Sequence, residues 1–452
     1  MNETRQLARF AVETRFEDLP RDVIEHYKVY VLDNIASGLV GSVQPWSNMI
    51  ADMIRESECK GVCTILGQKW RTGLSGAALV NGAMIGGFET DHGSAPASGH
   101  PSGTVFPAAM AVAETEHKDG KSFITAMVLG YEALCRIGEA ATRAVEDVRG
   151  FHGPGTNGQF GAAVAVGKLL GFDEAKLTNA LGIAGTHSAG LLEFVWEGAM
   201  TKRIHLGRGA QMGLESALLA GKGFTGPSTV LEGKFGFFNV FSPSPQPERL
   251  LANIGKVWLG QGLQIKPYAC HGTHQSIVQG IDRFKASHPI TAKDIRKVTV
   301  AGSEFMVHKH SDCEPNSVMG AQYSMVFGVA IALARDIANP YVYSEQTLWD
   351  KEVRELATRV EAVVDPRFGE FNENNPHGEV TIDMNSGERH VIQIAGFKGL
   401  PTTPFNFDDA CGKLRTYAAP IIDKKQTEEI IDKVRHLEQL GDMAVVARLM
   451  GK

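Results

Sequence analysis

Residues 81–107 read N-G-A-M-I-G-G-F-E-T-D-H-G-S-A-P-A-S-G-H-P-S-G-T-V-F-P. An apolar, small-residue helix is predicted over 77–85, and a second apolar helix from about Val105. Gly86 and Gly87 weaken the first helix and favour its end. The polar loop that follows carries two carboxylates and two imidazoles, from Glu89, Asp91, His92 and His100. Because loops held by a rigid scaffold concentrate binding and catalytic groups, the stretch predicts a functional loop between two buried helices. In the alternative interpretation, the acids cap helices and the last histidine is a turn residue before proline.

The composition of the whole chain is that of a globular protein with a packed core. Its 452 residues are 43% hydrophobic and 21% charged, so disorder is not expected. At about 100–200 residues per domain, the length predicts two to four domains. The formal net charge of -6 argues against a general nucleic-acid surface, and it leaves room for a local basic pocket that binds an acidic substrate.

The cysteines and the ends of the chain indicate a cytoplasmic protein. Cys59 and Cys63 form the one close pair among six cysteines, without a second pair at zinc-finger spacing. Scattered thiols of this kind fit a reducing compartment. We expect no secretory signal at the N-terminus and no membrane span, because no run of about 18 apolar residues occurs.

The order of the periodic segments predicts a mostly α protein with an inserted mixed domain. Apolar residues at helical spacing dominate up to about residue 263, and we also expect helices over 187–194 and 321–338. Alternating strands are predicted at 295–301 and 360–365, and a hairpin at 378–397. The predicted domains are a large helical domain (1–263), a smaller α+β lid domain (264–397) and C-terminal helices that return to the helical domain (398–452). A cleft between two such domains is a usual place for a ligand.

Five clusters of polar residues are candidates for chemistry. They share hydrogen-bond donors or proton-transfer groups in glycine-rich or helix-terminal settings: Asp91, His92 and His100; His152; Lys202 and Arg203; His271 and His274; Gln322 and Tyr323. Each alone is weak evidence, because a single histidine is more often structural than catalytic. Together they form a donor-rich set that suits the carboxylates of a small acidic substrate, with histidine to move a proton.

Three other classes of site are disfavoured by the same residues. His271 and His274 have no H-E-x-x-H context and no third ligand in sight, so no metal is predicted. The glycine-rich segment 150–158 lacks G-x-x-x-x-G-K-[ST] and does not follow a strand, which argues against nucleotide binding. No serine or cysteine occupies a nucleophile elbow, so proton transfer beside a carboxylate is favoured over acyl transfer.

Four motifs in order resemble the MmgE/PrpD family. They are N-G-A-x-I-x-G-F-E-x-D (81–91), H-P-S-G (100–103), R-G-F-H-x-x-G-T-x-G-x-F-G-A-A (149–163) and T-K-R-x-H-x-G-R-x-A (201–210). The resemblance covers nearly the whole chain and implies a large helical domain with an α+β lid domain. It also implies a homodimer without an organic cofactor or metal. The family includes 2-methylcitrate dehydratase, cis-aconitate decarboxylase and iminodisuccinate epimerase.

The resemblance also implies site residues. The catalytic positions that match the family are Asp91, His100, His152, Lys202, His271 and Tyr323, and the neighbouring substrate-binding candidates are His92, Arg203, His274 and Gln322. We expect Lys202, Arg203 and His271 to hold carboxylates. Either His100 or His152 would move the proton, with Asp91 orienting a histidine. The chain departs from the common family pattern at Gly86-Gly87 and at Asp91-His92.

The function expected from the sequence is a cofactor-independent lyase, a dehydratase or decarboxylase, that acts on a small di- or tricarboxylate. Loss of water, loss of carbon dioxide and return of the proton to the opposite face would all pass through a carboxylate-stabilised carbanion. An epimerase of a dicarboxylate such as iminodisuccinate is therefore the first alternative. A non-catalytic carboxylate-binding dimer on the same scaffold is the second.

Overall fold

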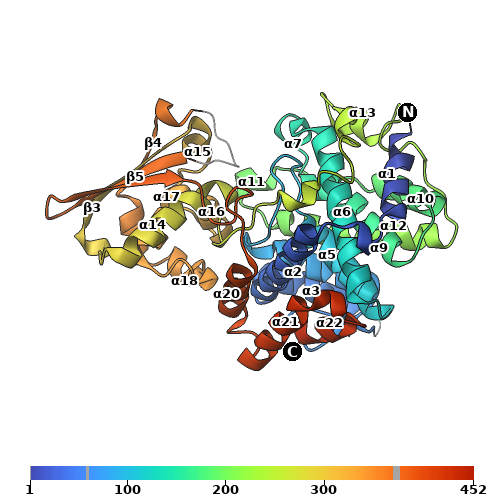
Figure 1. Ribbon diagram of the computed structural model, residues 1–452. Helices are drawn as coiled ribbons and strands as arrows, with labels where there is room; N and C mark the ends of the chain where they lie inside the picture. Colours follow the sequence, from blue (N-terminus) through green and yellow to red (C-terminus); the bar gives the residue numbers. More distant parts are fainter. Residues whose placement is uncertain (1, 58–60, 370–376) are drawn as a thin grey trace. The chain divides into compact units, whose positions relative to one another are not determined.

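The computed structural model describes residues 2–57, 61–369 and 377–452 (Figure 1). The chain divides into two compact units, which we describe separately. The larger unit comprises Met1–Gln264 and Phe405–Lys452, and the smaller unit comprises Ile265–Pro404. Helices dominate both units, so the predicted mostly α class is confirmed. The lid arrangement remains a prediction.

In the part of the larger unit that the structure describes, the regular elements are helices and one two-stranded ribbon, β1 (Cys63–Thr64) with β2 (Arg71–Thr72). Its N-terminal segment contains α1 (Glu3–Glu13), α2 (Arg21–Ser42), α3 (Pro45–Ser57), α4 (Leu74–Ile85), α5 (Pro101–Thr115), α6 (Gly120–Ala141), α7 (Ala144–Asp147), α8 (Gly153–Thr156), α9 (Gly158–Leu169), α10 (Glu174–Gly185), α11 (Phe194–Glu197), α12 (Thr201–Gly221) and α13 (Phe237–Phe241). Its C-terminal segment contains α20 (Phe407–Ala418), α21 (Lys424–Arg435) and α22 (Ala444–Met450).

Glycines let the helices of the larger unit approach to backbone contact. α12 packs against α4 and α9, and α4 also packs against α5. A Cβ atom on Gly207 of α12 would stand 2.2 Å from the carbonyl oxygen of Leu79 on α4. A Cβ atom on Gly82 of α4 would stand 2.5 Å from the carbonyl oxygen of Gly103 on α5. These contacts explain why glycine recurs inside apolar helical sequence, and they fix the ends of the helices that carry the polar loop.

The C-terminal helices belong to the same core as the N-terminal ones. α20 begins after Asn406, whose side chain accepts a hydrogen bond from the backbone N–H of Asp409 in a capping box. The helix packs against α2, which is buried almost all round from Tyr27 to its end. The last 48 residues therefore complete the larger unit rather than extending beyond it.

The smaller unit is a four-stranded sheet with helices. The strands are β3 (Ile295–Gly302), β4 (Val360–Val364), β5 (His377–Met384) and β6 (Arg389–Ala395), in the order β4-β3-β5-β6. β3 is parallel to β4 and antiparallel to β5, and β5 and β6 form the predicted hairpin. The helices are α14 (Gln275–Ser287), α15 (Glu304–Lys309), α16 (Val318–Tyr323), α17 (Met325–Ala334), α18 (Glu345–Leu348) and α19 (Lys351–Ala357).

Three predicted helix positions are corrected. α5 starts at Pro101 rather than near Val105, since proline is well tolerated at the first helical position. Residues 187–193 are irregular, because Gly190 has a φ of +106° and its carbonyl accepts a hydrogen bond from the backbone N–H of His152. The helix predicted over 321–338 is broken at Ser324, which takes an extended conformation and caps α17.

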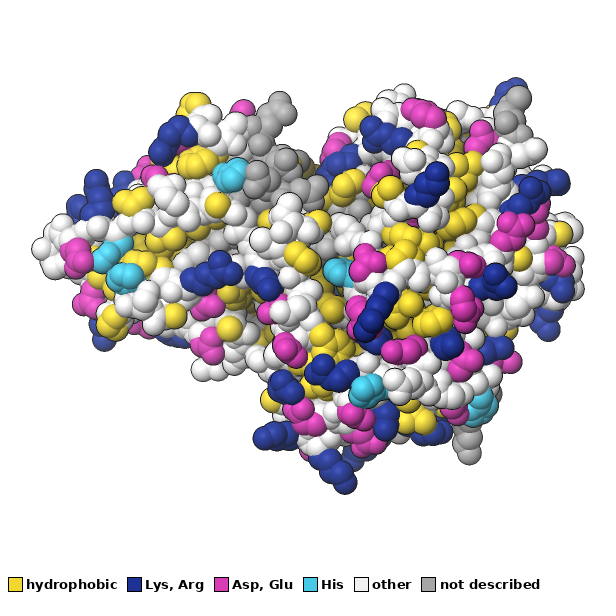
Figure 2. Space-filling model, viewed as in Figure 1, with side chains coloured by type: hydrophobic (Ala, Val, Ile, Leu, Met, Phe, Trp, Pro, Cys, Tyr) yellow, Lys and Arg dark blue, Asp and Glu magenta, His cyan; other side chains and the backbone are white. Residues whose placement is uncertain are grey.

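The surface features agree with an ordinary globular protein. On the face shown in Figure 2, acidic and basic side chains are interspersed. Among the described residues, none of the helices has the length and hydropathy that a membrane span requires. Cys135, Cys313 and Cys411 are free thiols, while Cys59 of the predicted close pair lies outside the described residues.

Candidate active site

The polar loop between α4 and α5 is held in an unusual backbone conformation. After α4, a short 3-10 turn over Gly86–Phe88 ends at Glu89, which has a φ of 57° in the left-handed region. A carboxylate side chain is strained there, and such strain clusters at functional sites. An isolated bridge between Ser94 and Gly99 then closes the loop back towards α5.

Asp91 and His100 form a short hydrogen-bonded pair. His100 is the N-cap of α5, and its Nδ1–H donates to Asp91 Oδ2 over 2.6 Å. Asp91 is 1% exposed, and the same oxygen also accepts a hydrogen bond from Ser102 Oγ. A carboxylate on Nδ1 fixes the tautomer that leaves Nε2 of His100 able to accept a proton, and it stabilises the imidazolium that results.

His92 points away from Asp91 into the interior of the larger unit. Its Nδ1–H donates to Asp33 Oδ2 over 2.6 Å, and its Nε2 lies 3.0 Å from the hydroxyl of Tyr131. Lys413 of α20 donates to the other oxygen of Asp33 and to the carbonyl of Thr90. Burial alone would raise the pKa of Asp33, but Lys413 and His92 outweigh it and hold that pKa below its usual value. With a fully buried side chain and both ring nitrogens bonded within the protein, His92 anchors the loop, and this geometry does not favour the predicted substrate-binding role.

Lys202 and Arg203 lie in the first turn of α12, and their side chains reach the 3-10 turn and Glu89 before the loop. The Lys202 ammonium pairs with the carboxylate of Glu89, and both side chains are buried. Arg203 lies over the ring of Trp46 and donates from Nε to the carbonyl of Gly87 over 3.2 Å. The buried Arg203 is thus engaged by the turn itself, which argues for a structural role over the predicted carboxylate contact.

His152 lies opposite His100, at the N-cap of α8. The ring centroids of the two histidines are 6.2 Å apart. His152 Nδ1 lies 3.1 Å from Nδ1 of His205, on the same helix as Lys202. Burial is the main cause that holds the pKa of His152 well below its usual value, and His205, Lys202 and His100 lower it further. The pKa of His205 falls to about 4, through burial and the charge of Lys202.

The larger unit therefore brings four of the predicted catalytic residues into one cluster: Asp91, His100, His152 and Lys202. It contains a carboxylate-supported imidazole, a neutral imidazole and a buried ammonium, which together can hold an anion and transfer a proton. Glu89 and His205 are part of the same cluster and were missed as site residues. Both lie in the quoted motifs. Glu89 is two residues before Asp91 and His205 is three residues after Lys202, so the sequence could have identified them as candidates.

The smaller unit holds the second set of predicted residues. His271 and Tyr323 lie with ring centroids 4.8 Å apart, and the His271 ring stacks on His310 at the same distance. His310 was not predicted as a site residue. Its Nδ1–H donates to the carbonyl of Tyr323 over 2.9 Å, because a carbonyl oxygen can only accept. The side-chain amide of Gln322 is buried and donates to the carbonyl of Ala269, which makes it a support for the chain before His271.

His271, His274 and His310 are close enough to be considered as metal ligands, with donor nitrogens within 4.8 Å of one another. His310 is 36 residues after His274 in the sequence, so their spacing did not indicate that the two lie together. The Nδ1 atom of His271, however, accepts a hydrogen bond from the backbone N–H of Thr273, so its proton sits on Nε2 in the neutral ring. An Nε2–H group is a donor for a carboxylate and not a metal ligand, and the arrangement fits anion binding better than a metal.

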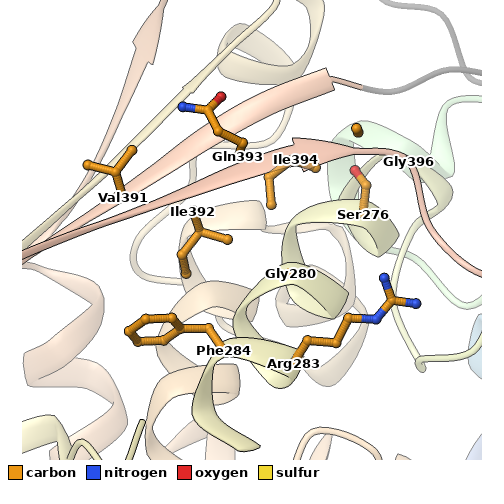
Figure 3. A pocket seen from close by; sticks show the side chains of 10 residues that line it. Ser276, Gly280, Arg283, Phe284, Val391, Ile392, Gln393, Ile394 and Gly396 are labelled. Carbon is orange, nitrogen blue, oxygen red and sulfur yellow. The ribbon is translucent and has the colours of Figure 1, made fainter. Parts of the chain in front are cut away.

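A separate pocket of about 490 Å³ opens on the smaller unit between α14 and β6 (Figure 3). Ile392 and Ile394 of β6 line it from one side, and Gly280, Arg283 and Phe284 of α14 line it from the other. A Cβ atom on Gly280 would stand 2.3 Å from Ile394 Cδ1, so the glycine allows strand and helix to approach. None of the predicted site residues lines this pocket.

Comparison with known sequences agrees with the motifs. A cis-aconitate decarboxylase-like protein of Aspergillus oryzae is 30% identical, covering 99% of this chain and 97% of the relative. The cis-aconitate decarboxylase of Aspergillus terreus is 28% identical over 99% of this chain and 95% of its own length. The human cis-aconitate decarboxylase is 27% identical over 95% of this chain and 90% of its own length. The sequence model of the MmgE/PrpD N-terminal domain matches residues 5–250, and that of the C-terminal domain matches residues 268–439. By both measures, and across almost its whole length, this chain belongs to the MmgE/PrpD family.

Proposed function

We propose that this protein is a cofactor-independent lyase that removes a carboxyl group from a small unsaturated tricarboxylate of the cis-aconitate type. The family membership and the names of the relatives support a lyase that acts on a small carboxylate. The choice of decarboxylation over dehydration rests on those relatives, since the three compared are named as decarboxylases or decarboxylase-like.

The observation that carries the proposal is the pairing of Asp91 with His100 opposite His152. With ring centroids 6.2 Å apart, the two imidazoles are close enough for both to contact one small anion. One imidazole has a carboxylate to support a positive charge, and the other is kept neutral by its buried surroundings. Two proton-transfer groups with opposed environments are typical of sites that run acid and base chemistry together.

Lys202 supplies the positive charge in this scheme. In the unliganded cluster it is compensated by Glu89, so a substrate carboxylate would share or replace that partner. The same ammonium would stabilise the enediolate-like anion that develops as carbon dioxide leaves, which is usually the largest catalytic contribution. We assign His92 and Arg203 to positioning, because both are held inside the larger unit by protein groups.

The reaction is balanced as follows. The bond between the substrate carbon and its carboxylate breaks, the electron pair stays on carbon, and carbon dioxide departs. The carbanion is stabilised by conjugation with the remaining carboxylate, and a histidine then delivers one proton to carbon. Each turnover consumes one proton. No step requires a redox partner.

We also propose that the smaller unit takes part as the predicted lid. His271 would donate from Nε2–H to a substrate carboxylate, with Tyr323 and His274 as further donors. Closure of a lid excludes water and strengthens such contacts. Gln322 would act through the backbone of His271, whose N–H donates to the Gln322 carbonyl over 2.9 Å.

The test is incubation of the purified protein with cis-aconitate, citrate, 2-methylcitrate and iminodisuccinate in deuterated water, followed by NMR. The proposal predicts loss of carbon dioxide from cis-aconitate and one deuterium in the product. Water loss from citrate or 2-methylcitrate would make the protein a dehydratase. Deuterium exchange without a net product from iminodisuccinate would make it an epimerase. Calorimetric binding with no turnover or exchange of any compound would leave the non-catalytic carboxylate-binding protein.

The proposal includes a cytoplasmic homodimer, as the resemblance implies. Light scattering at working concentration should report twice the mass of the chain, and a monomer mass with full activity would contradict it. Fractionation of the native cells should recover the protein with cytoplasmic markers.

A further inference from the structure

His205 was not predicted as a site residue, but its ring makes a polar contact with the ring of His152. The two Nδ1 atoms are 3.1 Å apart, and their ring centroids are 5.2 Å apart. Two imidazole nitrogens at this distance form a hydrogen bond only if one carries a proton and the other does not. The protonation of Nδ1 in one ring therefore determines the protonation of Nδ1 in the other.

The surroundings keep a single proton between the two rings. Phe194 presents an edge-on ring to both histidines, with centroids 5.2 Å from His152 and 5.7 Å from His205. Burial lowers the pKa of both rings, and the charge of Lys202 acts in the same direction on each. His100 also lowers the pKa of His152, while Glu89 raises it. At neutral pH the pair is uncharged, so each ring has one N–H.

Only two arrangements are then possible. If His205 donates from Nδ1, the neutral His152 carries its own proton on Nε2 and can give it to a substrate. If His152 donates from Nδ1, its Nε2 is bare and can accept a proton. Conversion of one arrangement into the other moves the shared proton across the 3.1 Å contact, while Nε2 of the accepting ring loses a proton and Nε2 of the donating ring gains one.

The two rings differ in their access to water. His152 is 5% exposed, whereas His205 is only half-buried. Gly190 lies against His205, where a Cβ atom would be 3.3 Å from Nδ1, and the Gly190 carbonyl accepts the backbone N–H of His152. The segment at Gly190 thus holds the two rings together, and His205 provides the outer end of the pair.

We propose that His205 is a proton-relay residue, which passes a proton to Nδ1 of His152 as His152 delivers its own Nε2 proton to the substrate carbon, and which is itself reprotonated from solvent. The inference rests on the proposed function, because a decarboxylase must import one proton for each carbon dioxide that it releases. His205 acts through His152 and does not itself touch the substrate in this scheme.

The relay is balanced at each atom. His152 gives its Nε2 proton to the carbanion, and a C–H bond forms. Nδ1 of His205 transfers its proton to Nδ1 of His152, and Nε2 of His205 takes a proton from water or buffer. Both rings are neutral before and after, with the proton positions inverted. Between turnovers the reverse shift restores the pair. Nδ1 of His152 returns the shared proton to Nδ1 of His205, Nε2 of His205 releases one proton to solvent, and Nε2 of His152 takes one up. The relay therefore keeps His152 from becoming an imidazolate when it delivers its proton, and each turnover consumes one proton.

The decisive variants are His205→Asn and His205→Ala. The asparagine side chain can still hydrogen-bond to His152 Nδ1 and hold the ring, but it cannot relay a proton. We expect His205→Asn to lower kcat for cis-aconitate by about 10²-fold, the lower end of the range for acid–base groups, with KM changed by no more than about twofold. Added imidazole should restore part of the activity of His205→Ala, in proportion to its concentration. His436→Asn, an exposed change in the same unit, is the matched control.

A result that contradicts the relay is equally clear. Wild-type kcat in His205→Asn would overturn it, since that variant keeps the hydrogen bond and lacks the proton transfer. Loss of activity in His205→Ala without any rescue by imidazole would also overturn it, because a purely structural role predicts that outcome.

A measurement without turnover separates the relay from the proposed function. In the free protein labelled with ¹⁵N-histidine, exchange between the two arrangements predicts an Nδ1 shift for His152 between the protonated and unprotonated extremes. His205→Asn should move this shift to one extreme. If it does so while cis-aconitate is not turned over, the proposed reaction is wrong and the proton-sharing pair stands. If the shift lies at one extreme in both proteins, the relay is wrong.

Discussion

At the scale of single residues, the site depends on what each imidazole has beside it. His100 faces a carboxylate that is 1% exposed, at 2.6 Å. His117 and Asp442 make the same kind of pair on the surface, at 2.9 Å, with the histidine 69% exposed. Water screens the surface pair, so its contribution is small, whereas the buried pair keeps its full directional effect. The same two residue types therefore differ in role because of their surroundings.

Asp91→Asn should lower kcat by about 10²–10⁴-fold while the protein stays folded, because the amide cannot support an imidazolium on His100. Steady-state kinetics and circular dichroism test this. Asp442→Asn is the matched control and should retain wild-type kcat. A kcat for Asp91→Asn within about twofold of the control would remove the Asp91–His100 pair from the mechanism.

His152→Ala should lose activity in the same range of about 10²–10⁴-fold, because the ring delivers the proton in the proposed scheme. His436→Ala serves as the control. Near-normal turnover of His152→Ala would transfer the proton-delivery role to His100 and would exclude the relay through His205 as well.

At the scale of elements, close helix packing sets the position of the side chains in the proposed site. Lys202 and His205 lie on α12, whose approach to α4 depends on Gly207. α4 in turn leads into the turn with Glu89. A displacement of α12 away from α4 would separate the Lys202 ammonium from the Glu89 carboxylate. The packing of these helices therefore sets the geometry of the proposed site.

Gly207→Ala should destabilise the protein by about 1–3 kcal/mol, the usual cost of overpacking, because the added methyl group meets a backbone carbonyl. Urea unfolding measures the change. Gly412→Ala in α20 is the control, since a Cβ atom there meets nothing within 4 Å. That variant should gain up to about 1 kcal/mol from helix propensity. Equal stability of the two variants would contradict the packing argument.

The C-terminal helix α20 is tied to the polar loop through Lys413. Its ammonium lies 2.5 Å from Asp33 and 2.7 Å from the carbonyl of Thr90, next to Asp91 in sequence. Lys413→Met leaves Asp33 buried with only His92 as a partner, and breaking a buried pair costs about 3–5 kcal/mol.

We therefore expect lower stability and lower kcat in Lys413→Met, measured by urea unfolding and by steady-state kinetics. Lys424→Met on α21, an exposed position, should behave as wild type. If Lys413→Met keeps full activity and stability, the tail does not position the loop.

At the scale of the whole molecule, buried neutral histidines link stability to pH. The pKa values of His26 and His205 fall from 6.5 to about 4, in both cases mainly through burial. Between these pH values the unfolded chain binds more protons than the folded one. The two histidines therefore do not reduce the free energy of unfolding above pH 6.5. Below pH 6.5 they reduce it progressively as the pH falls towards 4.

The free energy of unfolding should therefore decrease from pH 7 to pH 4.5, as followed by urea titrations. His26→Phe should reduce the slope, because the phenylalanine keeps the edge-on contact with Tyr30 and has no proton to gain. His436→Phe is the exposed control. A slope unchanged in His26→Phe would show that His26 does not contribute.

Some of the architecture follows from local pattern alone. The hairpin of β5 and β6 was predicted because its alternation and its turn at 385–387 are short-range signals. The start of α5 at Pro101 was missed, although proline at a first helical position is itself a local signal. The break at Ser324 was missed because the apolar sequence runs straight through it. The serine there bonds to its own chain instead of continuing the helix.

The sequence by itself determined the family, the mostly α class and the residue types available for chemistry, because motifs, periodicity and composition are local properties of the chain. Only the tertiary structure decided which of those residues lie in contact with one another. It turned His92 and Arg203 inward, gave Lys202 a carboxylate partner and put His205 beside His152. The physical reason is that burial and long-range hydrogen bonds, such as the one from Lys413 to Asp33, join residues hundreds of positions apart, and they set the charge state on which the chemistry depends.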